Sequence, residues 1–311
     1  MVFCTDFVTL LVHKIPIMKK STLIILCVFG MISALAQEKP TETIPDSTKA
    51  WTTKGNISLL FNQSNFNNWL SGGENNLSGN LGVNYDFNYK KEEWTWDNKV
   101  IASYGVVKTK NSPFEKKTDD RFELNSLLGK KAIGYWFYSG FLNFKTQITQ
   151  GYVYGKDVNG TEIRTEFTDV LSPGYLTFGP GMLWKKSDNL KFNLAPATSK
   201  ITIVDKEFTL PNEAYFGVKE GETTRYELGF HASGYYKLII MANVSIENIL
   251  GLYSNYLEDP QNVDLDYQMN VVMKINRYLT TNIAFQTIYD DNAFRGFQTR
   301  QVFGVAVNYG F

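Results

Sequence analysis

Apolar and polar residues alternate one by one through most of the chain after Trp51. Across residues 77–89 the odd positions are apolar or Gly, and the even positions are Ser, Gly, Asn or Asp. A period of two places successive side chains on opposite faces of a β-strand. The alternation recurs at 226–236 and 263–271. Such runs exceed the usual globular strand of about 5–6 residues and suit the roughly 9–11 that a tilted strand needs to cross a bilayer.

About twelve runs of this kind predict an all-β fold, a transmembrane antiparallel up-and-down β-barrel. They cover residues 54–63, 76–89, 94–108, 121–130, 135–147, 174–185, 190–195, 224–236, 238–252, 263–275, 279–289 and 300–311. The seventh run is the weakest, because Pro196 interrupts it and proline cannot donate to a strand ladder.

The connections between these runs alternate in length. Long ones span 64–75, 109–120, 148–173, 196–223, 253–262 and 290–299, whereas short polar ones fall at 90–93, 131–134, 186–189, 237 and 276–278. Outer-membrane barrels show this alternation, with long extracellular loops and short periplasmic turns. The alternation of long and short connections therefore predicts that the protein is located in the outer membrane of a Gram-negative bacterium.

The last run ends in alternating aromatic and small residues, with Tyr309 and Phe311 at its end. This ending resembles the terminal-strand signature of bacterial outer-membrane proteins, and the resemblance implies recognition by the barrel-assembly machinery. Aromatic residues also gather near the ends of other runs, as in 85–89, 94–96 and 135–138, which is typical of an interfacial girdle. Outer-membrane lipid and lipopolysaccharide are the other partners expected.

The N-terminal segment has the features of a secretory signal peptide. Lys19 and Lys20 precede an apolar run at 23–29, and small residues at Ala34 and Ala36 mark a cleavage site after Ala36. The apolar run is too short to span a bilayer as a helix.

Three parts of the chain are therefore expected. Residues 1–36 form the signal peptide, with 1–17 either an upstream extension before the true start or a longer positive region. Residues 37–50, rich in Pro, Thr, Glu and Lys, form a flexible periplasmic leader. Residues 51–311 form the barrel.

Composition narrows the function. The chain carries 31 basic and 31 acidic residues, so it lacks the basic surplus that nucleic-acid binding requires. Cleavage after Ala36 would remove both cysteines and one of the two histidines. The mature chain then relies on no disulfide and cannot build a zinc site from His and Cys. No metal or cofactor is predicted, and the oligomeric state stays open.

Two segments carry a family resemblance, residues 64–76 (SNFNNWLSGGENN) and residues 171–177 (LSPGYLT). They resemble uncharacterised outer-membrane proteins of Bacteroidetes type, a family defined as a domain of unknown function. The resemblance spans about residues 51–311. It implies an outer-membrane barrel and brings no activity and no functional residues.

The charged residues that alternate with the apolar face should line the lumen. The candidates are Asp86, Asp97, Lys99, Glu123, Lys145, Arg225, Glu227, His231, Glu247, Asp264, Asp266 and Lys274. Because both signs are mixed, two interpretations stand equally: a weakly selective polar pore, or a closed lumen filled by salt bridges. Twelve strands fall between plugged eight-stranded barrels and open porins, so strand number does not decide between them.

His231 shares the lumen face with Ser233 and Glu227, a combination that resembles the base, nucleophile and acid of a lipid hydrolase. A lumen histidine hydrogen-bonded to its neighbours is the favoured interpretation, because residue types alone specify a triad loosely. No enzymatic activity is predicted.

Acidic residues offer a carboxylate-only calcium site, at Asp259, Asp264 and Asp266 or at Asp290 and Asp291. Neither set matches a twelve-residue calcium loop, so solvated loop acids are favoured.

The loop at 65–76 holds Trp69 beside Gly72 and Gly73. It either folds into the barrel mouth as a constriction or binding surface, or is an ordinary hairpin loop, which the Gly and Asn content favours.

Three functions remain. The leading hypothesis is a small porin-like channel for polar solutes. The alternatives are a non-conducting scaffold that binds assembly partners, and a lipid-modifying hydrolase that uses His231.

Overall fold

The computed structural model describes residues 50–65, 74–210 and 215–310. The predicted signal peptide, the loop residues Trp69, Gly72 and Gly73, and the terminal Phe311 lie outside these ranges. No helix within the described ranges has the length and apolarity to cross a membrane.

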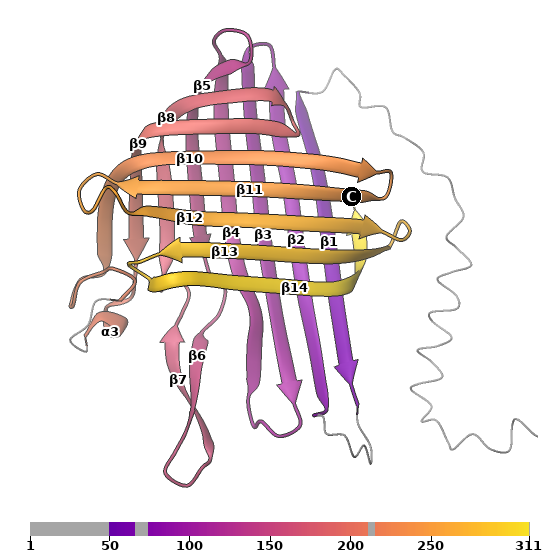
Figure 1. Ribbon diagram of the computed structural model, residues 1–311, viewed down its shortest axis with the longest axis vertical. Helices are drawn as coiled ribbons and strands as arrows, with labels where there is room; N and C mark the ends of the chain where they lie inside the picture. Colours follow the sequence, from indigo (N-terminus) through magenta and orange to yellow (C-terminus); the bar gives the residue numbers. More distant parts are fainter. Residues whose placement is uncertain (1–49, 66–73, 211–214, 311) are drawn as a thin grey trace, which may run out of the picture. The chain divides into compact units, whose positions relative to one another are not determined.

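Fourteen strands and one short helix make up the described chain (Figure 1). Their bounds are β1 Trp51–Ser64, β2 Asn76–Lys91, β3 Trp94–Thr109, β4 Glu115–Lys131, β5 Trp136–Thr146, β6 Gly151–Lys156, β7 Glu162–Thr168, β8 Gly174–Ser187, β9 Leu190–Ile203, α3 Lys206–Thr209, β10 Thr224–Met241, β11 Val244–Asn255, β12 Val263–Lys274, β13 Leu279–Asp290 and β14 Phe294–Gly310.

Twelve of these strands form a closed antiparallel barrel, in the order β1-β14-β13-β12-β11-β10-β9-β8-β5-β4-β3-β2. The barrel closes where β1 pairs with β14, with Asn56 opposite Gly310 and Leu60 opposite Ala306. Strands β6 and β7 form a separate hairpin. The predicted twelve-stranded barrel is confirmed.

Alternation along the strands separates an outer and an inner face. On β14, Phe303, Val305 and Val307 are exposed outside the barrel, whereas Ala306 and Asn308 between and beyond them are buried. The neighbouring β1 repeats this with its exposed apolar residues at 57, 59 and 61. The barrel is therefore apolar outside and polar inside, the reverse of a soluble sandwich.

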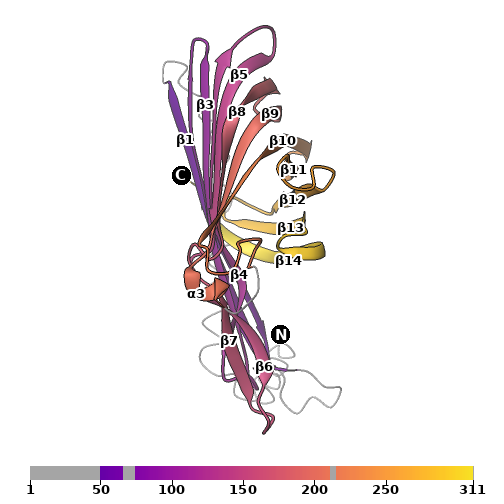
Figure 2. The same ribbon diagram turned by 90° about the vertical axis from the view of Figure 1, so that its left-hand side faces the viewer.

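The strands group into two facing walls. In Figure 1, β10–β14 run across β1–β4, and Figure 2 shows the two sets of strands from the side. The short turns lie at one end of the barrel, here called the turn end. The β5–β8 and β9–β10 connections lie at the other, here called the loop end, where the β6–β7 hairpin extends away from the barrel.

Several boundaries differ from the sequence prediction. β9 does not stop at Pro196 but continues to Ile203, because the proline falls in a register shift where the pairing of β9 with β10 skips from Ala195 to Thr198. Bulges tolerate a residue that cannot donate a ladder hydrogen bond. β10 likewise runs through Lys237, which was expected to be a turn, because Lys237 pairs with Glu247 and the turn forms at residues 242–243.

Candidate functional site

Side chains from opposite walls meet inside the barrel. β4 and β12 stand opposite each other, with five strands between them on either side. The Arg121 guanidinium on β4 nevertheless donates a hydrogen bond to Gln268 Oε1 on β12 at 3.1 Å. β3 and β11 are opposite as well, and Lys99 Nζ lies 3.9 Å from the Glu247 carboxylate. The lumen is therefore crossed by polar contacts across its full width.

The strongest of these crossings joins β5 to β12. Lys145 Nζ donates to the Asp266 carboxylate at 2.7 Å, and Gln286 also donates to that carboxylate at 2.9 Å. Beside it, Glu123 accepts hydrogen bonds from Arg121 and from Asn125. Two cations and two carboxylates thus form one connected network, in which each charge has a partner of opposite sign.

A second network surrounds Lys200 on β9. Its ammonium lies 2.8 Å from Asp264, 3.5 Å from Glu227 and 3.6 Å from Asp290, which belong to β12, β10 and β13. Glu227 is only 2% exposed, so its charge depends on this cation and on Arg225, whose guanidinium lies 3.1 Å away. A buried carboxylate without such partners would carry a large desolvation cost.

A third network closes the turn end. Asp97 on β3 accepts hydrogen bonds from Lys185 Nζ on β8 and Lys191 Nζ on β9, at 2.9 and 2.8 Å. Neither lysine sits on a strand adjacent to β3. This contact therefore joins strands that are not neighbours in the barrel wall, as do Lys145 with Asp266 and Lys200 with Asp264.

At the loop end the lumen widens into a cavity of about 410 Å³. Its lining includes the ion pair of Asp119 on β4 with Arg300 on β14, 2.5 Å apart, and the pair of Lys145 with Asp266. Positive and negative groups are matched around it.

His231 packs within the lumen against an aromatic ring. Its imidazole stacks on Phe141 of β5, with ring centroids 4.7 Å apart and planes 16° apart. His231 Nδ1 is buried and has no hydrogen-bond partner within the described ranges. The favoured prediction, a histidine hydrogen-bonded to its neighbours, therefore fails at Nδ1. The contact that the ring does make is the stacking on Phe141. Among the described side chains no carboxylate hydrogen-bonds to this imidazole, so the base–acid contact of a triad is not assembled, and the hydrolase hypothesis stays a prediction.

Acidic residues do gather at the loop end, in a different combination from the two sets predicted. Carboxylate oxygens of Asp264, Asp290 and Asp291 lie within 4.8 Å of one another. Asp266 instead pairs with Lys145. The Lys200 ammonium forms ion pairs with two of these three acids, Asp264 and Asp290.

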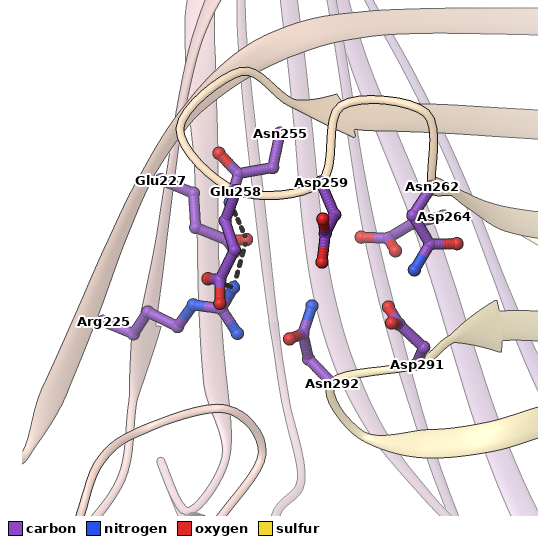
Figure 3. A pocket seen from close by; sticks show the side chains of 9 residues that line it. All are labelled: Arg225, Glu227, Asn255, Glu258, Asp259, Asn262, Asp264, Asp291 and Asn292. Atoms are coloured by element: carbon purple, nitrogen blue, oxygen red, sulfur yellow. Dashed lines mark hydrogen bonds and ion pairs between the residues drawn. The ribbon is translucent and has the colours of Figure 1, made fainter.

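Next to this cluster lies a small polar cavity of about 30 Å³, room for a water molecule (Figure 3). Asp259 from the β11–β12 loop faces Asp291 and Asn292 from the β13–β14 loop. On the opposite side Arg225 holds Glu258 at 2.8 Å.

The remaining candidates are more peripheral. Asp86 lies 3.9 Å from Lys99, at the edge of the crossing between β3 and β11. Lys274 is exposed at the turn end of β12, opposite Thr280. Tyr309 faces outward on β14 opposite Ile57 and is 63% exposed.

Sequence reasoning missed several partners that complete these networks. They are Asp119, Arg121, Lys185, Lys191, Lys200, Gln268 and Arg300. Arg121 and Glu123 are two residues apart and so share a face, a signal that was available. Lys200 and Asp119 were hidden because they fell in segments interpreted as loops.

One family model matches part of the chain. Residues 61–152 match a family described as "Protein of unknown function (DUF3078)". The match covers less than a third of the chain, from β1 to the start of β6. It agrees with a resemblance to a family of unknown function, while the Bacteroidetes-type assignment stays a prediction. No curated protein matches the chain.

Solved structures with a similar fold include bacterial barrels. The COG4313 outer membrane channel from Pseudomonas putida F1 has 8% identity and a TM-score of 0.38, over 88% of this chain and 99% of that one. The translocator domain of autotransporter NalP from Neisseria meningitidis has 10% identity and a TM-score of 0.37, over 94% and 98%. The beta domain of the Bordetella autotransporter BrkA has 7% identity and a TM-score of 0.34, over 84% and 98%. Similarity at this level assigns no activity to the present chain.

Proposed function

We propose that this chain is an outer-membrane protein whose barrel crosses the bilayer. Support comes from its outer face, which exposes large apolar side chains on strand after strand, among them Leu59, Phe61, Leu81, Phe303 and Val305. Exposing so much apolar surface to water is costly, whereas lipid accepts it. A closed barrel also leaves no unpaired strand edge in the hydrocarbon region.

Within this barrel we propose a small channel for polar solutes that is closed at rest. The observation that carries the proposal is the contact of opposite walls, Arg121 with Gln268 and Lys145 with Asp266. A solute can pass only when these pairs separate. The lining is polar and of both signs from the 410 Å³ cavity to the Asp97 network, so an opened path would be weakly selective.

Conductance in planar bilayers tests this function. The wild-type barrel should show only rare, small openings, because the resting lumen is bridged. The double variant Lys145→Ala/Asp266→Ala removes one crossing without leaving an unpaired charge in that pair, and should open several-fold more often. The matched control is Lys116→Ala/Glu162→Ala, a 2.5 Å ion pair that joins the loop-end start of β4 to the β6–β7 hairpin and does not cross the lumen, so this variant should behave as wild type.

Two results would contradict the proposal. A steady, large wild-type current would show that the lumen is open at rest. Silence of the Lys145→Ala/Asp266→Ala barrel at all salts and voltages, with insertion verified, would show that this crossing does not gate a conducting lumen and would favour a scaffold.

The scaffold function has an observation of its own. The β6–β7 hairpin extends beyond the barrel (Figure 1). Its exposed apolar side chains include Val153, Ile163 and Phe167. Exposed apolar side chains on a projecting element are typical of protein contacts. If the barrel is a scaffold, cross-linking from membranes should recover a stoichiometric partner, and Val153→Ser/Ile163→Ser should abolish its recovery.

A further inference from the structure

A row of aromatic side chains crosses three neighbouring strands on the outer face near the turn end. Cross-strand pairing places Trp51 beside Tyr89 and Tyr89 beside Trp96, on β1, β2 and β3. The ring centroids of Trp51 lie 5.2 Å from Tyr89 and 5.8 Å from Trp96. Trp51 and Trp96 are exposed. Aromatic side chains of this kind mark the level where hydrocarbon meets headgroups.

One pleat closer to the turns, lysines and aromatics alternate in a second row. The register pairs Lys91 with Trp94, Trp94 with Lys130, and Lys130 with Tyr138, across β2 to β5. Lys130 Nζ lies 5.5 Å from the centroid of the Trp94 ring. Because residues two apart along a strand share a face, this row points outward like the aromatic row beneath it.

The two lysines of this row differ from those of the lumen. Lys145, Lys185 and Lys200 are each bound to a carboxylate. By contrast, within the part of the chain that the structure describes, no carboxylate forms an ion pair with Lys91 or Lys130. Both are exposed, so two lysines without an ion-pair partner in the described ranges flank the exposed indole of Trp94.

We infer that Lys91 and Lys130 bind the phosphate of an anionic phospholipid, with Trp94 packed against its glycerol backbone. This inference rests on the proposed position of the barrel in a bilayer. Lysine at the interface extends its ammonium toward the headgroups while its aliphatic stem stays in contact with apolar surface. Two cations on either side of one indole favour a net-negative headgroup over a zwitterionic one, because a zwitterion returns an ammonium to the same site.

Native mass spectrometry of the full chain from nanodiscs tests the site. Nanodiscs of phosphatidylethanolamine with a minor share of phosphatidylglycerol provide the lipid. The wild-type barrel should retain phosphatidylglycerol several-fold above its bulk share. The variant Lys91→Gln/Lys130→Gln should lose this enrichment, whereas the control Lys156→Gln/Lys206→Gln, exposed lysines at the loop end, should keep it.

Insertion is scored separately, by protease protection in the same nanodiscs. Failure of the wild type to insert would overturn the proposed function itself. Normal insertion without phosphatidylglycerol enrichment, or enrichment that survives Lys91→Gln/Lys130→Gln, would overturn only the lipid site. If Lys91→Gln/Lys130→Gln folds poorly, quenching of Trp94 in the wild type by brominated phosphatidylglycerol, measured against Trp94→Phe, decides instead. Stronger quenching than by brominated phosphatidylethanolamine supports the site, and equal quenching contradicts it.

Discussion

The Arg121 guanidinium donates a hydrogen bond to Gln268 Oε1 at 3.1 Å, although the two residues lie on opposite walls of a twelve-stranded barrel. Barrels of this strand number have room for a lumen between their walls. Long polar side chains fill that room here. The interior is therefore a layer of polar contacts rather than an unobstructed water-filled passage.

The Lys145–Asp266 pair should stabilise the barrel measurably. Asp266→Ala leaves the Lys145 ammonium without its 2.7 Å partner, and should lower the free energy of unfolding by roughly 1.5–3 kcal/mol. Lys145→Ala/Asp266→Ala should lose less than the sum of the two single changes, because neither charge is left unpaired. Urea unfolding in lipid vesicles measures all three. Strict additivity would show that the two side chains do not interact.

A glycine permits close packing between β8 and β9. A Cβ at Gly181 would collide with the backbone carbonyl oxygen of Leu194, whereas a Cβ at Gly140 meets nothing within 4 Å. Gly181→Ala should therefore cost about 1–3 kcal/mol of stability, through forced backbone movement. Gly140→Ala, on the neighbouring β5, should change it little. Comparable unfolding midpoints for the two variants would contradict this packing.

The β6–β7 hairpin should loosen in acid. Glu162 accepts hydrogen bonds from Lys116 Nζ at 2.5 Å and from Ser112 Oγ at 2.6 Å, and these hold its pKa below the ordinary value of 4.5. Because the folded-state pKa is the lower one, this stabilisation is complete above the ordinary value and disappears as the pH falls through the lowered pKa.

Hydrogen exchange of the hairpin amides between pH 6 and pH 3 (about the range in which carboxylates titrate) measures this loosening. Wild-type protection should fall in acid. Protection in Glu162→Gln should start lower and change less with pH. A parallel acid response in both would assign the loosening to other groups.

The mature protein should begin at Gln37. Small residues at Ala34 and Ala36 match the pattern that a signal peptidase cleaves, which predicts cleavage after Ala36. N-terminal sequencing of protein from isolated outer membranes checks the boundary, and Ala36→Leu should leave precursor uncleaved. A mature chain that retains residues 18–36 would contradict the signal-peptide prediction.

The alternation of apolar and polar residues is enough to predict most of the fold. Every one of the twelve barrel strands overlaps a predicted run, because a polar inner surface and an apolar outer surface impose a strict period of two. Errors fall where that logic weakens. Pro196 looks like an end, yet a bulge accommodates it and β9 continues through Lys200. The β6–β7 hairpin lies outside the barrel, so its sequence is not under the same alternation, and the alternating runs did not predict it.

The lumen partners could be predicted only in part. Lys145 and Asp266 are both assigned to the inner face by parity, but their contact depends on how far each strand is staggered around the barrel. Stagger is set by strand register and by bulges such as the one opposite Phe230, and one sequence does not encode it in a readable way. Parity thus predicts which side chains face inward, and closure of the barrel decides which of them meet.

The most direct measurement is a nitrogen–carbon dipolar recoupling experiment on the wild-type barrel in bilayers. It measures the dipolar coupling between the Lys145 ammonium nitrogen and the Asp266 carboxyl carbon. The spectrum of Asp266→Asn identifies the carboxyl signal of Asp266. Strong dephasing is expected, because the Nζ–Oδ2 distance is 2.7 Å. Absence of dephasing, with both signals observed in the inserted protein, would show that the two walls stand apart and that the lumen is not closed at rest.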